Sequence, residues 1–163
     1  MHKSFLKDVL DYAPPKELRT LFIVHYSPLL LMILIGPLTA IYKVFELPID
    51  VRFSTVTGVV IFLLGTFVYF KWEIHWHKTF HGQLVTGGIF KYIRHPHYTS
   101  LLIIGFGLAF FFYSIVALAI AIIAVPIMIW SIFDEEKILL RQYGDEYRKF
   151  MKKTPWRLIP KIF

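Results

Sequence analysis

The stretch HPHYTSLLIIGFGLAFFFYSIVALAIAIIAVPIMIWSIF, His95–Phe133, contains no Asp, Glu, Lys or Arg. A helix that crosses a bilayer needs about 20 predominantly apolar residues, and this stretch is long enough for two such spans. We place the turn between them at Phe112–Ser114, which predicts helices at about Pro96–Phe111 and Ile115–Phe133. The two helices would form a hairpin in the membrane.

Two further apolar stretches precede this hairpin. Thr20–Tyr42 and Phe53–Phe70 also lack acidic residues, Lys and Arg throughout. The whole chain is 56% hydrophobic, above the value of about 45–50% that is usual in soluble domains. We predict an all-α integral membrane protein with about four transmembrane helices. It would form one domain over 1–163, with an N-terminal tail 1–19, a transmembrane core 20–133 and a C-terminal helical segment 134–163.

The basic residues indicate how the chain is oriented. The net charge is +7, and 16 of the 18 Lys and Arg residues fall in the N-terminal tail, between the second and third helices, or after the fourth helix. With four spans these segments share one side, which the positive-inside rule makes the cytoplasm. Topology and contact with anionic membrane lipids account for the charge, so we expect no nucleic-acid partner. We expect a monomer with both termini in the cytoplasm.

The reactive side chains limit the chemistry. The chain has no cysteine, which excludes a thiolate nucleophile or metal ligand. Its seven histidines raise the alternative of a metal-dependent membrane oxidoreductase, because imidazole together with carboxylate binds iron and zinc. The closest histidines, His75 with His77 and His95 with His97, are two residues apart, and such side chains diverge on a helix. We therefore predict no metal site.

Polar residues stand directly before the hairpin. In Arg94-His95-Pro96-His97-Tyr98, Pro96 is suited to the first helical position, where its missing N–H leaves no bond unmade, and His95 to the N-cap. A helix N-terminus with free amides attracts anions, and the planar charge of Arg94 suits a carboxylate or a phosphate. We predict a socket for an anionic group, with Tyr98 beside it. The alternative is that these residues only anchor the helix at the membrane interface.

A second polar group follows the fourth helix. We expect Glu135 and Glu136 to continue this helix out of the membrane and Gly144 to break it. Glu136 shares a helix face with Leu139, so at least one carboxylate points toward protein. A carboxylate that faces inward at a membrane border is a candidate for a functional role. The alternative is an exposed acidic pair that balances nearby basic residues.

Together the two groups resemble the isoprenylcysteine carboxyl methyltransferase and phospholipid methyltransferase superfamily, whose members are integral membrane enzymes that use S-adenosylmethionine. The matching residues are Leu84-Val85, Gly88-Ile89-Phe90, Arg94-His95-Pro96-His97-Tyr98, Glu135-Glu136, Leu139, Gly144-Asp145-Glu146-Tyr147 and Pro160. They span near half of the chain, and an apolar hairpin of the right length separates the two halves. One departure is Gly82, which stands where relatives often have a histidine.

The resemblance implies an S-adenosylmethionine-dependent methyltransferase whose C-terminal segment covers the cofactor. Its acceptor would be lipophilic and membrane-embedded, such as a prenylcysteine-like carboxylate or a phospholipid amine. The implied cofactor-binding residues are Leu84, Val85, Gly88, Arg94, His95, Tyr98, Glu135 and Glu136, and the implied catalytic residues are Arg94 and Glu136. The C-terminal residues 153–163 also resemble the end of membrane sterol reductases, which leaves an NADPH-dependent reductase as an alternative.

Overall fold

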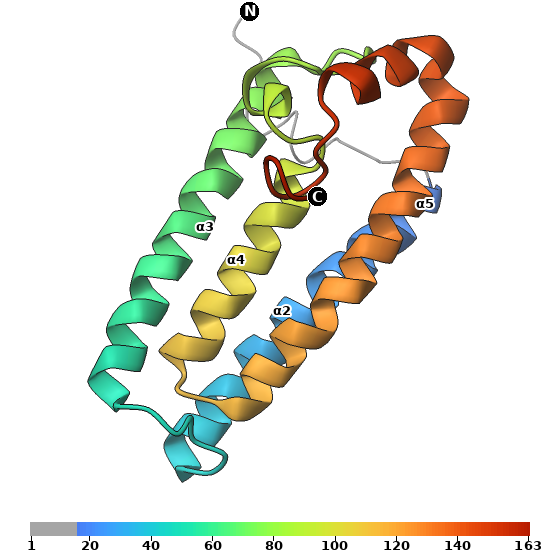
Figure 1. The fold of residues 1–163 in the computed structure, drawn as a ribbon. Coiled ribbons are helices and arrows are strands. Elements are labelled where there is room, and N and C mark those ends of the chain that lie inside the picture. The colour runs from blue at the N-terminus through green and yellow to red at the C-terminus, as the bar shows by residue number, and fades with distance from the viewer. Residues whose placement is uncertain (1–15) are drawn as a thin grey trace, which may run out of the picture.

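The computed structural model describes residues 16–163, with side chains from Ile23 onward. This range forms four α-helices and one short 3₁₀ helix, without a named strand. They are α2 (Lys16–Tyr42), α3 (Val51–Thr79), η1 (Gly88–Lys91), α4 (Pro96–Phe111) and α5 (Ile115–Lys153). The long helices lie side by side in an elongated bundle (Figure 1), which confirms the all-α prediction. Residues 1–15 of the predicted N-terminal tail lie outside the described range.

The predicted hairpin is formed by α4 and α5. α4 begins at Pro96 with His95 at its N-cap and ends at Phe111, as the sequence predicts. Ser114 becomes the N-cap of α5, where its hydroxyl accepts a hydrogen bond from the Ala117 N–H at 3.2 Å. This bond satisfies one of the amides that every helix start leaves open. The turn at 112–114 therefore has a local cause in the sequence.

α5 extends well beyond its apolar segment. It runs through Glu135 and Glu136 and is broken at Gly144, which confirms both predictions. Gly144 has a φ of 53°, in the left-handed region that glycine adopts without steric cost. Beyond this kink the chain is helical again up to Lys153 and turns across the end of the bundle (Figure 1). Both glutamates thus stand on a helix whose preceding turns pack in the apolar core.

α3 is longer than the sequence predicts. The predicted end at about Phe70 is wrong, because the helix continues to Thr79. Lys71 is the first charged residue after the apolar stretch Phe53–Phe70, but a charge does not end a helix when it lies on an exposed face, as Lys71 does. The additional turns are amphipathic, and their apolar side chains Trp72 and Trp76 pack against buried residues. Part of the predicted second loop is therefore helix.

α4 is the innermost helix and touches the other three. A Cβ atom at Gly107 would lie 2.6 Å from the backbone nitrogen of Phe62 in α3, so the two backbones approach as closely as only glycine permits. On its other side, Leu101 belongs to a buried apolar cluster with Met32 of α2 and Met128 of α5. This close packing fixes where the first turn of α4 lies relative to the other helices.

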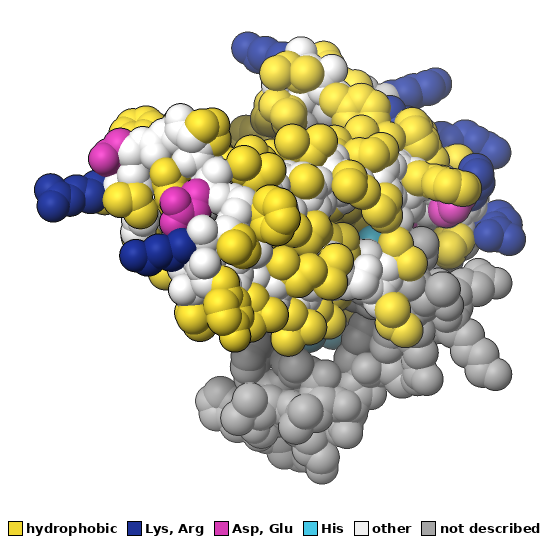
Figure 2. Space-filling view, turned by 90° about the horizontal axis from the view of Figure 1, so that it is seen from below, with side chains coloured by type: hydrophobic (Ala, Val, Ile, Leu, Met, Phe, Trp, Pro, Cys, Tyr) yellow, Lys and Arg dark blue, Asp and Glu magenta, His cyan; other side chains and the backbone are white. Residues whose placement is uncertain are grey.

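Three of the described helices are long and apolar enough to cross a membrane, namely Ile23–Tyr42, Val51–Thr79 and Ile115–Lys153. α4 has only 16 residues, so the count of four spans stays a prediction. The outer faces of α2 and α3 expose large side chains such as Leu34 and Phe67. In Figure 2, hydrophobic side chains cover most of the coloured surface and Lys and Arg stand at its margin. Such an exterior is suited to lipid rather than water.

Candidate functional site

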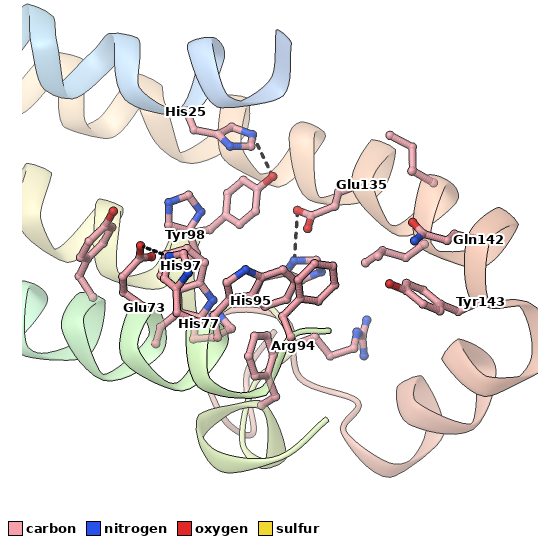
Figure 3. A pocket seen from close by; sticks show the side chains of 18 of the residues that line it. His25, Glu73, His77, Arg94, His95, His97, Tyr98, Glu135, Gln142 and Tyr143 are labelled. Carbon is pink, nitrogen blue, oxygen red and sulfur yellow. Dashed lines mark hydrogen bonds and ion pairs between the residues drawn. The ribbon is translucent and has the colours of Figure 1, made fainter. Parts of the chain in front are cut away.

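A cavity of about 370 Å³ lies at the end of the bundle where α4 begins (Figure 3). Its volume falls in the range of roughly 300–1,000 Å³ that is typical of small-molecule sites. Side chains from all four α-helices line it, and Tyr, Trp and Phe residues make up much of its wall. Two carboxylates, Glu73 and Glu135, and one arginine, Arg94, also belong to the wall.

The predicted cofactor residues fall into two groups. Those that line the cavity are Arg94, His95, Tyr98 and Glu135. Those that are not part of its wall are Leu84, Val85, Gly88 and Glu136. The two sequence segments, which lie on opposite sides of the apolar hairpin in the sequence, therefore do meet in space.

Leu84, Val85 and Gly88 lie close to the wall without forming it. Leu84 and Val85 pack in an apolar cluster that also contains the wall residue Phe90. Gly88 has a φ of 56°, and a Cβ atom there would lie 2.7 Å from the ring of His75. These residues shape the segment between α3 and α4. Their contact with a cofactor stays a prediction.

The N-terminal end of α4 is joined to the C-terminal segment of the chain. The Arg94 N–H donates to the Trp156 carbonyl at 2.8 Å, and the His95 N–H donates to the Arg157 carbonyl at 3.0 Å. The predicted anion socket relied on free amides at this helix end. Of the amides at this end, those of Arg94 and His95 are satisfied within the chain and Pro96 has none to offer, so any amide contribution to the socket falls to residues after Pro96.

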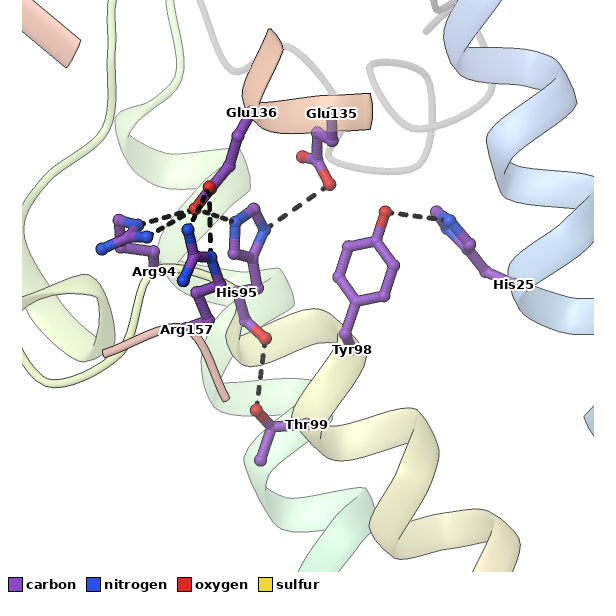
Figure 4. Close-up of polar contacts among 8 residues, drawn as sticks. All are labelled: His25, Arg94, His95, Tyr98, Thr99, Glu135, Glu136 and Arg157. Atoms are coloured by element: carbon purple, nitrogen blue, oxygen red, sulfur yellow. Dashed lines mark hydrogen bonds and ion pairs between the residues drawn. The ribbon is translucent and has the colours of Figure 1, made fainter. Parts of the chain in front are cut away.

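Arg94 and Glu136 form a buried ion pair, with exposures of 5% and 4%. Nε and Nη2 of Arg94 donate to Oε1 of Glu136 at 2.9 and 2.6 Å, and Nη1 donates to the Thr154 carbonyl at 2.7 Å. From the other side, Nε and Nη2 of Arg157 donate to Oε2 of Glu136 at 3.1 and 3.0 Å (Figure 4). Two arginines thus hold one carboxylate, which compensates for the loss of its hydration.

His95 connects the two adjacent glutamates. Its Nε2 lies 3.3 Å from Oε1 of Glu136, and its Nδ1 lies 3.5 Å from Oε2 of Glu135. Burial disfavours the charged imidazole, but the hydrogen bonds and the negative charges of Glu135 and Glu136 outweigh it and raise the pKa of His95 above its usual 6.5. The two carboxylates therefore favour the imidazolium form of His95.

The adjacent glutamates have different surroundings, a distinction that the sequence leaves open. Successive residues on a helix point about 100° apart. Glu136 faces Arg94 and Arg157, and its side chain is 6% exposed. Glu135 lines the cavity, and its side chain is 25% exposed. Of these two adjacent glutamates, Glu135 is therefore the one that a bound ligand would meet.

The opposite wall contains a polar network that the sequence analysis does not predict. The hydroxyl of Tyr26 lies 2.8 Å from Nε2 of His97 and 3.2 Å from the hydroxyl of Tyr69. The ring of His97 stacks on Trp72, with centroids 4.4 Å apart and an interplanar angle of 27°. Side chains from α2, α3 and α4 thus meet in one hydrogen-bonded and stacked group.

A periodic signal for part of this wall is present in the sequence. Tyr69, Trp72, Glu73, Trp76 and His77 recur at three- and four-residue spacing, which is one face of a helix, and all five line the cavity. Glu73 and His77 are paired at 2.8 Å. The signal is visible only if α3 is taken to extend beyond Lys71.

Among the residues that the structure describes, the histidines do not assemble into a metal centre. Within the described part of the chain, no three His, Asp or Glu side chains converge as a metal site requires. His77 faces the cavity, whereas His75 packs against Gly88 in a different direction. The alternative of a metal-dependent oxidoreductase therefore finds no ligand set among these residues.

A sequence model of the phospholipid methyltransferase family matches residues 53–146, which is more than half of the chain. The chain belongs to the phospholipid methyltransferase family. This membership confirms the resemblance found in the sequence and, with the apolar helices, indicates a membrane methyltransferase. No curated protein matches the chain.

The range matched by the phospholipid methyltransferase family contains only some of the residues that line the cavity. It includes most of α3, all of α4 and most of α5, and hence Arg94, His95 and both glutamates. It excludes α2, which contributes Tyr26, and the segment after residue 146. The central residues of the site thus lie within the matched range, while the wall residues from α2 lie outside it.

Proposed function

We propose that the protein binds S-adenosylmethionine in the cavity and transfers its methyl group to a lipophilic acceptor that arrives from the membrane. The observation that carries this proposal is the placement of Glu135 in an aromatic-lined cavity at the end of an apolar helical bundle. A water-soluble donor and a membrane-soluble acceptor both have access to such a position. Family membership supports the reaction class.

The wall residues fit a cationic cofactor. Bound S-adenosylmethionine supplies a methyl group on a positively charged sulfonium. Aromatic faces attract cations, and Trp76 and Tyr143 both line the cavity. The carboxylate of Glu135 and the amide of Gln142 provide acceptors and donors for hydroxyl and amino groups. The size and chemistry of the wall are therefore suited to this group.

Arg94 and Glu136 have different proposed roles. Arg94 lines the cavity and stays our predicted contact for a carboxylate of the cofactor or the acceptor. Its bonds to Glu136 and Thr154 use three of the five N–H donors of a guanidinium. Glu136 is outside the wall, and we assign it the task of orienting Arg94 and His95. The work of the site is alignment and exclusion of water.

The charges of the wall favour an amine as the acceptor. Glu73 adds a carboxylate to the wall from α3, whereas Arg94, Arg157 and His95 lie against Glu135 and Glu136 in a separate cluster. The carboxylate of Glu73 attracts the ammonium form of an amine and repels a carboxylate, and the amine must lose its proton before it accepts the methyl group. A phospholipid amine therefore fits better than a prenylcysteine-like carboxylate.

Calorimetry on the detergent-purified protein tests the cofactor assignment. We expect S-adenosylmethionine to bind, and Glu135→Gln to weaken the binding about tenfold or more, because hydrogen bonds to a charged group contribute about 1.5–3 kcal/mol. Glu146→Gln is the matched control, since Glu146 is an exposed glutamate on the same helix. Equal affinity in the wild type and Glu135→Gln would remove Glu135 from the site. Binding of NADPH in place of S-adenosylmethionine would favour the reductase.

A methyl-transfer assay tests the acceptor. Radiolabelled S-adenosylmethionine would be supplied with vesicles that contain phosphatidylethanolamine or, separately, a farnesylated cysteine with a free carboxylate. We expect label in the phospholipid fraction. Label in the cysteine derivative alone would contradict the amine assignment while leaving the methyltransferase assignment intact.

A further inference from the structure

The C-terminal segment, residues 154–163, runs along the beginning of α4. In addition to the two backbone bonds from residues 94 and 95, the hydroxyl of Thr99 donates to the carbonyl of Leu158 at 2.9 Å. Leu158 is buried in the same apolar cluster as Tyr98. The segment therefore continues the packing of α4 by hydrogen bonds and by apolar contact.

One side chain of this segment reaches the centre of the polar network. Arg157 donates from two nitrogens to Oε2 of Glu136, as described above, and its guanidinium lies over the rings of Phe133 and Phe163, at 5.0 and 5.4 Å from their centroids. Aromatic rings on a guanidinium limit its motion and add cation–π attraction. Arg157 is therefore held in one orientation, with its donors directed at Glu136.

We propose that Arg157 is a positioning residue: it fixes the C-terminal segment to Glu136 and thereby holds the wall residue His95 in place. The inference rests on the proposed function in so far as His95 borders the cofactor cavity. Glu136 receives Arg94 and His95 on Oε1 and Arg157 on Oε2. Without Arg157, one of its two oxygens loses the bonds that the structure shows. Arg157 also lies beyond residues 53–146, so the family match does not assign it.

Two measurements on the full chain in detergent test the proposal. The variants are Arg157→Ala, Arg157→Lys and, as the matched control, Arg148→Ala, since Arg148 forms an exposed ion pair with Asp145 on the same end of the molecule. The first measurement is calorimetric binding of S-adenosylmethionine. We expect about tenfold weaker binding for Arg157→Ala and an intermediate value for Arg157→Lys, because lysine keeps the charge but not the two-pronged geometry.

Chemical rescue separates positioning from general loosening of the fold. We expect millimolar methylguanidinium to restore much of the binding to Arg157→Ala and to leave Arg148→Ala unchanged, because the added cation can occupy the space between Glu136 and the two aromatic rings. Wild-type affinity in Arg157→Ala, or a loss that methylguanidinium does not restore, would overturn the proposal. If Arg157→Ala does not fold, the affinity of Arg157→Lys for S-adenosylmethionine tests the proposal. Wild-type affinity in Arg157→Lys would contradict the role of the two-pronged contact.

The second measurement needs no cofactor. Amide hydrogen exchange, followed by mass spectrometry, reports on the bonds from Arg94 and His95 to the C-terminal segment. We expect these amides to exchange at least tenfold faster in Arg157→Ala than in the wild type or in Arg148→Ala. Unchanged exchange in Arg157→Ala would refute the anchoring role, whether or not the wild type binds S-adenosylmethionine. Failure of the wild type to bind S-adenosylmethionine would by itself refute only the proposed function.

Discussion

The hydroxyl of Tyr26 lies 2.8 Å from Nε2 of His97, which ties α2 to the first turn of α4 at the wall of the cavity. The same hydroxyl lies 3.2 Å from that of Tyr69 in α3. These bonds form a polar link between α2 and α3, which have little other direct contact. The link joins a helix outside the family-matched range to two helices within it.

Loss of this link is expected to destabilise the bundle modestly. Tyr26→Phe removes the hydroxyl and keeps the ring, so we expect a loss of about 1 kcal/mol in the free energy of unfolding, the usual net contribution of a hydrogen bond. A double-mutant cycle with Tyr69→Phe is expected to be non-additive, since the two groups touch. Tyr92→Phe, at a 68% exposed position, is the control. Strict additivity of Tyr26→Phe and Tyr69→Phe would show that the bond between them contributes nothing.

The two adjacent glutamates are expected to differ in what they contribute to stability. Glu136→Gln leaves Arg94 without its buried counter-charge, and breaking a buried pair costs about 3–5 kcal/mol. Glu135→Gln affects a partly exposed carboxylate and is expected to cost less. Denaturant unfolding of both variants beside Glu146→Gln gives the comparison. A larger loss for Glu135→Gln than for Glu136→Gln would contradict the assignment of Glu136 as the structural member.

The raised pKa of His95 predicts a pH-dependent stability. The folded state binds the proton of His95 more tightly than the unfolded state, whose pKa is about 6.5. Its stabilising contribution is therefore complete below that pH and is lost as the pH rises through the raised pKa. We expect the melting temperature to fall over this range and His95→Gln to flatten the fall. A His95→Gln profile parallel to the wild type would show that another group is responsible.

Gly88 and Gly82 offer a comparison of backbone and steric effects. Both have a positive φ, 56° and 91°, so alanine at either position carries backbone strain of about 1–2 kcal/mol. Only at Gly88 does a new Cβ also meet the ring of His75. We expect Gly88→Ala to reduce the free energy of unfolding more than Gly82→Ala does. Adding His75→Ala should recover the difference, and equal losses in the two glycine variants would argue against the steric contact.

Much of the hairpin was predictable because its signals are local. A run of apolar residues, a proline suited to the first position of α4 and a glycine suited to a left-handed kink each act within a few residues of chain. These signals gave the bounds of α4, the turn before α5 and the break at Gly144, and all three are confirmed. They also predict that Arg94 and Glu136 lie near each other, because the two ends of a helical hairpin lie at the same end of the bundle.

The remainder of the site depends on contacts that local signals do not contain. The end of α3 is set by the packing of Trp72 and Trp76 rather than by the first lysine. The amides of Arg94 and His95 donate to the carbonyls of Trp156 and Arg157, which follow the whole of α5 in the chain. No local signal near Arg94 indicates these two bonds, so the sequence predicts free amides at this helix end. No spacing in the sequence relates Tyr26 to His97, because helix-to-helix distance is decided by close packing around α4.

The bonds from Arg94 and His95 to Trp156 and Arg157 also set an order of assembly. Synthesis proceeds from the N-terminus, and segments fold as they become available. All four α-helices precede residues 154–163, so the helices can pack before the partners of these two amides have left the ribosome. The first turn of α4 is therefore completed by residues that are made after all four α-helices, and the pocket reaches its final form only once residues 154–163 have joined the bundle.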